Sequence, residues 1–399
     1  MINEENKIII EKGSKKAKDK TICEKCQKNK SKIFNKNKFL CFDCFDEIII
    51  HKFKSNLRTC CKIRQEDYIL VCISGGNFSM GMLEMFHQSF DNSKSNKKLF
   101  FKIKILYIDD SLFLQNKEKI IEERKNRRLI LDKIIKDYNF NYDIINLEKV
   151  LDLNNPNLNL VDSNLYENEL IEKYLKIFNK IPTQGGYRKK FITITINNLI
   201  FYYALKNNFY KITFGNNGQS LVNQTFFSII TGNGKDVKHN ITQIDDSYLK
   251  GKILLYRPLQ DFTDREILYF NHYHKVQVVY PVYADDKLTK ILSNFIGKLQ
   301  AEKMNTVPTV VNTAEKVVRY KCEKICKFCL NNSDNNMNKL EFGLDSKLND
   351  EKCLLNKELC YGCRRMFSDI IQDFFSEEKK EESILYINYI LNMFKFFNV

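Results

Sequence analysis

The chain has 399 residues, 43% of them hydrophobic and 13% aromatic, so it can bury a sizeable core in one large domain or in several smaller ones. Its apolar runs fall far short of the roughly 20 residues that a membrane-spanning helix needs, and the first ten residues are too polar for a signal peptide. We therefore expect a soluble intracellular protein. The net charge of +15 favours polyanionic partners such as nucleic acids, although a lysine-rich genome gives the same charge without such a ligand.

The thirteen cysteines fall into two groups. In an intracellular chain, cysteines indicate metal binding or catalysis and not disulfide bonds. Each group contains two Cys-x2-Cys pairs, which can place four thiolates around one zinc ion. The predicted metal ligands are Cys23, Cys26, Cys41 and Cys44 in the first group, and Cys326, Cys329, Cys360 and Cys363 in the second.

The spacing within each group indicates the kind of metal site, and the cysteines outside the pairs are interpreted separately. Fourteen residues separate the two pairs of the first group, as in structural zinc ribbons, and thirty separate those of the second, where Cys322 and Cys353 are close enough in sequence to compete as ligands. An iron–sulfur cluster is the alternative to zinc, because thiolate ligation alone does not distinguish them. We interpret Cys60 and Cys61 as packing or surface thiols and Cys72 as a small buried hydrophobe.

Strand and helix patterns alternate through the middle of the chain. Short apolar runs predict buried parallel strands at 68–73, 101–108, 142–147 and 210–214. Helical periodicity predicts helices at 78–90, 116–137, 167–179, 189–208 and 218–230. The alternation predicts an α/β fold in which a parallel sheet carries helices on both faces.

The predicted organisation has four parts. Residues 1–20 form a disordered basic tail, and residues 21–66 form a zinc ribbon with a lead-in helix at 47–66. Residues 67–300 form the α/β domain, which includes an Asn-rich loop at 154–164. Residues 301–399 hold the second cysteine group, a flexible insertion at 330–352 and a packing helix at 383–399.

Two polar turns at strand ends are candidates for ligand binding. Ser74, Gly75, Gly76 and Ser79 stand between a buried strand and a helix, where glycines let the backbone approach a phosphate and the helix N-terminus attracts anions. An ordinary tight turn explains this pattern equally well. The stretch from residue 215 to residue 220 has no strong acid or base, and we interpret it as a turn with a helix N-cap.

Charged residues elsewhere allow two interpretations. Arg188, Lys189 and Lys190 can contact RNA phosphates or form a solvated helix start. Asp109 and Asp110 end a predicted strand at the edge where α/β ligands bind, and we interpret them as a solvated strand end.

The order and spacing of several segments resemble the cytoplasmic tRNA 2-thiolation protein 2 family. The resemblance spans roughly residues 21–395 and rests on no single decisive motif. Its segments are the first cysteine group with Phe45, Ser74-Gly75-Gly76, Gly232-Asn233-Gly234, Arg257-Pro258-Leu259-Gln260-Asp261-Phe262, and the second cysteine group with Leu359-Cys360-Tyr361-Gly362-Cys363.

The resemblance implies the fold of the PP-loop ATP pyrophosphatases. The sulfurtransferases with this fold adenylate uridine C2, and sulfur then displaces AMP. Their loop reads Ser-Gly-Gly-x-Asp-Ser, and this chain has Phe78 at the acidic position. Active members carry a mid-domain Cys-x2-Cys pair where this chain has Pro182 and Gly185, and the segment 215–220 lacks both acids of their later motif. A sulfur relay needs a thiolate near the activated base, and loss of the loop acid weakens handling of ATP and magnesium.

The resemblance therefore implies an auxiliary subunit with no catalytic residue and with weakened handling of ATP. It implies a cytoplasmic heterodimer with a paralogous ATPase that takes sulfur from a thiocarboxylated ubiquitin-related modifier. The resemblance also implies 2-thiolation of the wobble uridine of the tRNAs for Lys, Glu and Gln, which yields 5-methoxycarbonylmethyl-2-thiouridine. The alternatives are an independently active tRNA sulfurtransferase or related adenylating amidohydrolase, and a zinc-ribbon RNA-binding protein without a role in thiolation.

Overall fold

The computed structural model describes residues 22–90, 101–155, 160–161, 166–283, 286–317, 324–333 and 359–374. The predicted basic tail, parts of the Asn-rich loop, most of the 330–352 insertion, the 383–399 helix, Cys322 and Cys353 lie outside these residues. The chain divides into two compact units, residues 1–52 and residues 53–399. Each unit is described by itself.

The first unit contains a short hairpin beside the first cysteine group. β1 (Ile33–Asn35) pairs with antiparallel β2 (Lys38–Leu40) through a two-residue turn. Both turn residues, Lys36 and Asn37, have positive φ values of 45° and 63°, as the favoured hairpin turns require. The helix α1 (Phe42–Ser55) follows and continues past the unit boundary.

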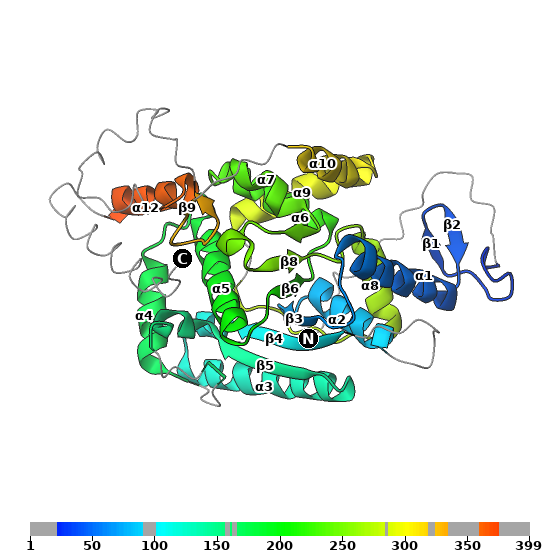
Figure 1. Cartoon of the computed structure of the whole chain (residues 1–399), viewed down its shortest axis with the longest axis horizontal. Helices are drawn as coiled ribbons and strands as arrows, with labels where there is room; N and C mark the ends of the chain where they lie inside the picture. The colour runs from blue at the N-terminus through cyan, green and yellow to red at the C-terminus, as the bar shows by residue number, and fades with distance from the viewer. Residues whose placement is uncertain are drawn as a thin grey trace. The chain divides into compact units, whose positions relative to one another are not determined.

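A mostly parallel sheet organises the second unit (Figure 1). Among the described residues it has six strands in the order β5-β4-β3-β6-β8-β7, and only β7 runs antiparallel to its neighbour. The strands are β3 (Tyr68–Ile73), β4 (Lys102–Asp109), β5 (Asn141–Asn146), β6 (Lys211–Phe214), β7 (Ile244–Asp245) and β8 (Leu254–Tyr256). The predicted parallel α/β fold is thus confirmed, and the prediction missed only the short strands β7 and β8.

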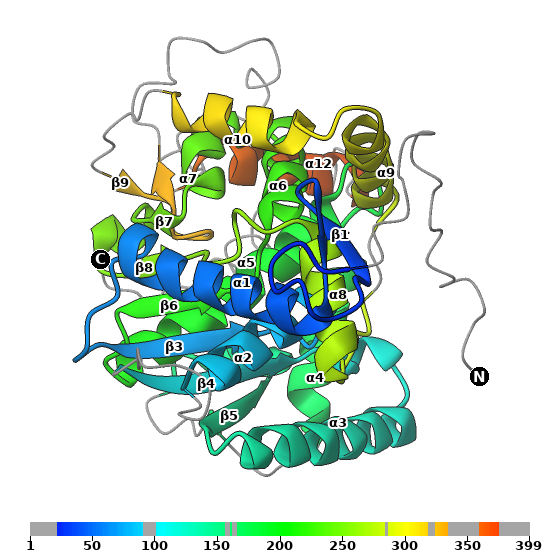
Figure 2. The ribbon, with the colours of Figure 1, turned by 90° about the vertical axis from the view of Figure 1, so that its right-hand side faces the viewer.

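Helices cover both faces of this sheet. α5 and α2 lie on opposite sides of it in Figures 1 and 2. Side chains alternate along each strand, so Leu70 and Cys72 join the core beneath α5, while Tyr107 on the other face meets Arg127 of α3. The helices of this region are α2 (Asn77–Phe90), α3 (Lys117–Asp137), α4 (Asn168–Asn179), α5 (Tyr187–Lys206), α6 (Gly218–Ile230), α7 (Val237–Ile241) and α8 (Asp264–His274).

Single-turn and irregular helices connect these elements. The predicted lead-in helix 47–66 is instead the end of α1 followed by the π-helical turn η2 (Asn56–Cys60). The remaining short helices are η3 (Ser111–Leu114), η4 (Leu147–Asp152), η5 (Gly234–Asp236) and η6 (Tyr248–Gly251). Side-chain caps begin several helices, including a reciprocal Thr263–Glu266 capping box at α8.

The C-terminal elements extend the second unit. They are α9 (Lys287–Glu302), α10 (Thr306–Glu315), the pair β9 (Lys324–Ile325) and β10 (Asn332–Ser333), and α12 (Tyr361–Phe374). Phe328, Leu330 and Phe367 belong to the same hydrophobic core as α5, so the second cysteine group is built onto the α/β unit. In the part of the chain that the structure describes, no helix has the length and apolarity to cross a membrane.

Candidate functional site

The two predicted ligand-binding turns meet at the carboxyl edge of the sheet. They follow β3 and β6, which are adjacent parallel strands whose onward connections lie on different faces. A Cβ atom on Gly215 would lie only 2.7 Å from Cα of Ser79, so the backbones of the two turns are in contact. Ligands of open α/β sheets bind at such a switch point.

The serines of the first turn bond to each other and to the backbone. Ser79 Oγ accepts from the Ser74 N–H at 3.2 Å, donates to the Gly76 carbonyl at 3.1 Å and lies 3.2 Å from Ser74 Oγ. These bonds hold the turn before α2 in one compact conformation. The first turn of α2 carries Phe78 and no acidic side chain, so the loop offers no carboxylate to a metal–nucleotide complex.

A segment distant in the sequence packs onto this turn. The Val279 N–H donates to the Gly75 carbonyl at 2.8 Å. A Cβ on Gly75 would lie 2.0 Å from the Val279 carbonyl oxygen, and Gly75 has a φ of +80°. Only glycine therefore fits this position. Residues 279–283, here called the 279–283 segment, thus cover one side of the loop.

Buried charges hold the other end of the 279–283 segment. Asp110 accepts from the N–H groups of Val282 and Tyr283 at 2.9 and 3.1 Å, and Arg127 donates to the Tyr280 carbonyl at 2.7 Å. Arg127 also pairs with Asp110 at 2.7 Å. Hydrogen bonds and an ion pair therefore join the loop, the 279–283 segment and the end of β4.

The prediction that Asp109 and Asp110 form a solvated strand end is wrong. Their exposed fractions are 2% and 7%, because arginines of α3 reach back beneath the strand end. Arg124 is fully buried between Asp109, at 3.1 Å, and Glu148, at 2.9 Å. Burial raises the pKa of Glu148, although Arg124 acts in the opposite direction. The network is structural, since its charges neutralise each other inside the protein.

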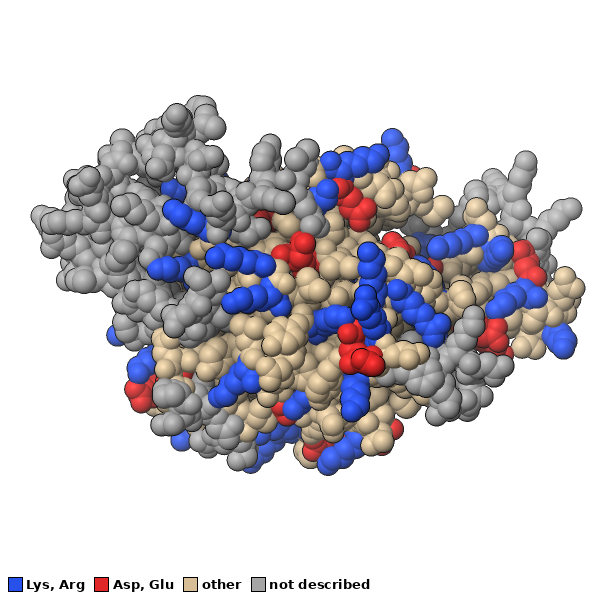
Figure 3. Space-filling model, viewed as in Figure 1, with Lys and Arg blue, Asp and Glu red and all other residues tan. Residues whose placement is uncertain are grey.

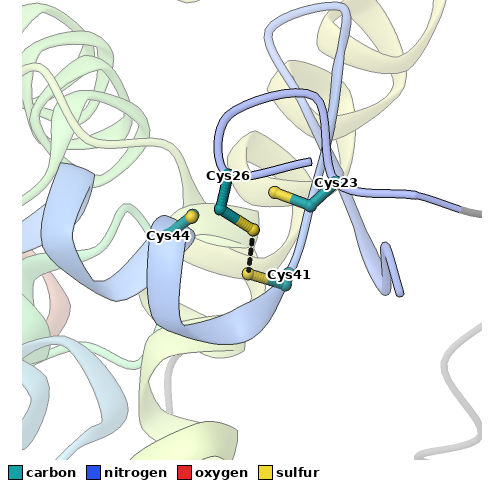
Figure 4. A group of neighbouring side chains, drawn as sticks. All are labelled: Cys23, Cys26, Cys41 and Cys44. Atoms are coloured by element: carbon teal, nitrogen blue, oxygen red, sulfur yellow. Dashed lines mark hydrogen bonds between the residues drawn. The ribbon is translucent and has the colours of Figure 1, made fainter. Parts of the chain in front are cut away.

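The first predicted cysteine group is assembled in the N-terminal unit (Figure 4). One pair lies in the loop before β1, and the other lies at the start of α1. The four sulfur atoms lie within 4.8 Å of one another, and those of Cys26 and Cys41 are 3.9 Å apart. Desolvation by itself raises the pKa of the Cys23 thiol, but backbone N–H donors lower it to about 6, which favours the thiolate that a metal requires.

The second predicted group is assembled in the same way. Its four sulfur atoms also lie within 4.8 Å of one another, and those of Cys329 and Cys360 are 3.7 Å apart. A knuckle between β9 and β10 supplies one pair, with the Cys326 N–H donating to the Asn331 carbonyl at 2.8 Å. The start of α12 supplies the other pair. Both groups can therefore hold a metal ion.

Lys190 belongs to this second site and not to an RNA-contacting surface, which corrects its predicted role. It is only 7% exposed. Its ammonium donates to the Gly362 carbonyl at 2.6 Å, to Asn233 Oδ1 at 2.6 Å and to the Thr231 carbonyl at 3.2 Å. Asn233 in turn points its amide at Cys360 Sγ, 3.8 Å away. One feature of the sequence points to this contact, since Asn233 and Gly362 both lie in segments that carry the family resemblance.

The neighbouring basic residues are only half-buried. Arg188 donates to the Ile181 carbonyl at 2.9 Å, and its guanidinium lies 5.1 Å from the ring centroid of Phe178. These contacts fix the side chain beside the start of α5. Lys189 is likewise half-buried, so this pair keeps partial access to solvent.

Sequence reasoning missed a third polar cluster around His239, Asp245 and Asp246. Their ligand atoms lie close enough together for a metal ion. Arg257, however, bonds Asp245 Oδ2 at 3.0 Å and also donates to the His239 and Thr242 carbonyls. Because this guanidinium already neutralises the buried carboxylate, we interpret the cluster as structural.

No family model matches the chain. It is 25% identical over 343 residues to the cytoplasmic tRNA 2-thiolation protein 2 of Danio rerio, covering 74% of this chain and 67% of that relative. It is 23% identical over 387 residues to the protein of the same name from Drosophila mojavensis, covering 87% and 90%. The chain is therefore similar to cytoplasmic tRNA 2-thiolation protein 2 over most of its length.

A solved structure shows the same fold. The U34-tRNA thiolase NcsA from Methanococcus maripaludis, determined with its 4Fe–4S cluster, matches with a TM-score of 0.52 and 14% identity, covering 79% of this chain and 93% of that one. In this chain, the segments around Asn233 and Gly362, which carry the sequence resemblance, meet in space, because a Cβ on Gly362 would collide with Asn233 Oδ1 at 1.9 Å.

Proposed function

We propose that this chain is a subunit of a cytoplasmic tRNA 2-thiolation complex, acting on the wobble uridine of the tRNAs for Lys, Glu and Gln. The observation that carries the proposal is a PP-loop-like strand edge without the groups that the chemistry needs, in a chain similar to tRNA 2-thiolation proteins over most of its length. The chain would act with a paralogous ATPase subunit that receives sulfur from a thiocarboxylated ubiquitin-related modifier.

The cysteines support a non-catalytic role. No cysteine stands between Cys72 and Cys322 in the sequence. Cys72 lies in β3 only two residues before the loop, but it is buried beneath α5, and burial raises the pKa of its thiol well above the ordinary value. A thiol that resists ionisation and has no access to solvent cannot relay sulfur. The partner would therefore have to supply the reactive thiolate.

We propose zinc as the ion in both cysteine groups. A tetrahedral site with Zn–S bonds of about 2.3 Å places its sulfurs roughly 3.8 Å apart. The separation in each group, 3.9 Å for Cys26–Cys41 and 3.7 Å for Cys329–Cys360, is compatible with this value. A four-iron cluster binds each thiolate at a different iron and so spreads the sulfurs further apart. When bound, zinc would cross-link the two cysteine pairs of each group.

Arg188 and Lys189 remain the proposed tRNA contacts near the start of α5, without the buried Lys190. They would contact phosphates and would position the tRNA without reading its sequence. The retained phosphate-loop residues, Ser74, Gly75, Gly76 and Ser79, would maintain the fold at the sheet edge and would not process ATP.

Thiolation of an unmodified tRNA transcript tests the proposed function. The assay would contain ATP and sulfide and would compare this chain alone, the ATPase subunit alone and the two together. We expect thiolation only when the ATPase subunit is present, and a higher rate when this chain is added. Turnover by this chain alone would favour an independent sulfurtransferase. An equal thiolation rate for the ATPase subunit with and without this chain would favour an RNA-binding protein without a role in thiolation.

A further inference from the structure

We propose that the N-terminal hairpin binds an unpaired nucleotide of RNA, with Phe34 stacking on the base and nearby lysines meeting the phosphates. The inference deepens the proposed function, on which it rests for the identity of the RNA. It assigns a binding site to a unit whose cysteine group otherwise has only a structural role.

The hairpin separates its two faces by strand alternation. Ile33 and Leu40 are opposite each other and only 2% exposed, so they form the interior of the small unit. Phe34 and Phe39 are also opposite each other and occupy the other face, with ring centroids 4.8 Å apart. Phe34 is 56% exposed. A rigid aromatic ring is thus presented to solvent on a short ribbon that the cysteine group holds in place.

The segment that carries this ring is rich in lysine. Six lysines and no acid stand between residues 25 and 42, and all six are exposed. They are Lys25, Lys28, Lys30, Lys32, Lys36 and Lys38. Lys25 pairs with Glu47 at 2.7 Å, and the Lys32 ammonium lies 5.3 Å from the ring centroid of Phe42. Among the described residues, no ion pair neutralises Lys28, Lys30 or Lys38.

This chemistry fits single-stranded RNA better than a protein surface. Every base has a π face that can stack on phenylalanine, and basic side chains beside the ring follow the backbone. Asn37, in the turn itself, adds an amide group for base edges. A stable protein interface needs on the order of 1,000 Å² with an apolar centre, and one exposed ring among lysines does not provide that centre.

The test measures binding of the full zinc-loaded chain to a labelled single-stranded RNA of about 12 nucleotides, and to a duplex of the same length, by fluorescence anisotropy. We expect Phe34→Ala to weaken single-strand binding about tenfold, within the range of base–aromatic stacking, and to change duplex binding much less. Phe34→Trp should retain binding. Phe295→Ala removes a comparably exposed ring, 52% exposed on α9, and should leave binding unchanged.

Each outcome decides the proposal. Unchanged single-strand binding in Phe34→Ala, or equal losses for single strand and duplex, would overturn it. If Phe34→Ala misfolds, which its zinc content would reveal, failure of the well-folded Phe34→Trp variant to bind would also overturn it. Loss of association with the ATPase subunit at unchanged RNA affinity would identify a protein interface instead. The thiolation assay of the two subunits reports separately on the proposed function.

Discussion

Arg257 and Asp245 form a buried ion pair, with exposed side-chain fractions of 4% and 1%. Ser247 also bonds Asp245 Oδ1 through its N–H at 3.0 Å and its hydroxyl at 2.7 Å. The arginine begins a segment through which the sequence resembles the tRNA 2-thiolation protein 2 family, and its spacing alone predicts no function. The structure gives it one, because it closes the edge of the sheet at β7 and β8.

We predict that Arg257→Met lowers the free energy of unfolding by about 3–5 kcal/mol, since it leaves a buried carboxylate without its partner. Urea denaturation at pH 7 measures this change. Adding Asp245→Asn to the variant should restore part of the loss, because it removes the orphaned charge. A single variant as stable as the parent protein would contradict the prediction.

The same pair sets a pH dependence. Desolvation raises the pKa of Asp245, but His239, Arg257 and Ser247 together bring it to about 2, below the ordinary 3.8. A carboxyl group with a lowered folded-state pKa contributes stability above its unfolded pKa and loses it as the pH falls through the folded pKa. The stability difference between the parent protein and Arg257→Met should therefore shrink between about pH 4 and pH 2, which paired denaturation curves would show.

Gly75 and Gly76 are adjacent glycines with different requirements. We predict that Gly75→Ala displaces the 279–283 segment and costs about 1–3 kcal/mol, because a Cβ would lie 2.0 Å from the Val279 carbonyl oxygen at a φ of +80°. Faster hydrogen exchange at the Val279 amide would report the displacement. Gly76→Ala is the control, since its Cβ meets only Ser74 Oγ, at 3.7 Å. Equal hydrogen exchange at the Val279 amide in the two variants would argue against this packing of the 279–283 segment onto Gly75.

At the scale of elements, sequence patterns predict the strands and helices that have an apolar run or period. They do not predict short strands or charges that are buried by tertiary contacts. β3 and α6 were predicted at their observed bounds, because buried strands are continuous apolar runs and helices are periodic. β7 and β8 are two and three residues long, too short for any period. Arg124 of α3 and Lys190 of α5 had the pattern of solvated helix faces, and only the fold shows that their charges are buried.

The second cysteine site joins elements that are far apart in the chain. Lys190 of α5 and Asn233 before η5 both contact the Cys360–Cys363 pair, through Gly362 and Cys360. Asn198 of α5 also donates to the Phe328 carbonyl at 2.9 Å. Metal binding in this site should therefore stabilise the whole α/β unit and not only the local loop.

We predict that Lys190→Met lowers the thermal midpoint and that Asn233→Ala releases zinc faster, with about 10- to 100-fold lower affinity, as expected when a hydrogen bond to a ligand is lost. A colorimetric chelator measures the release. Lys189→Met, at the neighbouring half-buried position, is the control and should change neither quantity. If Lys189→Met and Lys190→Met behaved alike, the buried contact would not matter.

At the scale of the whole molecule, the two units share a basic character. Figure 3 shows Lys and Arg side chains spread widely over the viewed face, with acidic side chains between them. The proposed RNA contacts, the lysines of the hairpin and Arg188 with Lys189, lie in different units. Each unit thus contains both a cysteine group and proposed RNA contacts.

We predict that tRNA affinity falls steeply with salt, because each neutralised phosphate releases counterions and contributes about −0.7 to −0.9 to the slope of log K against log salt concentration. Combining Lys28→Ala with Lys38→Ala should make that slope less steep by about 2, whereas Phe34→Ala should lower affinity at every salt concentration and keep the slope. Lys133→Ala on α3 tests whether loss of any exposed positive charge has the same effect. If all lysine variants changed the slope equally, the net charge of +15 and not the hairpin would direct the RNA to the protein.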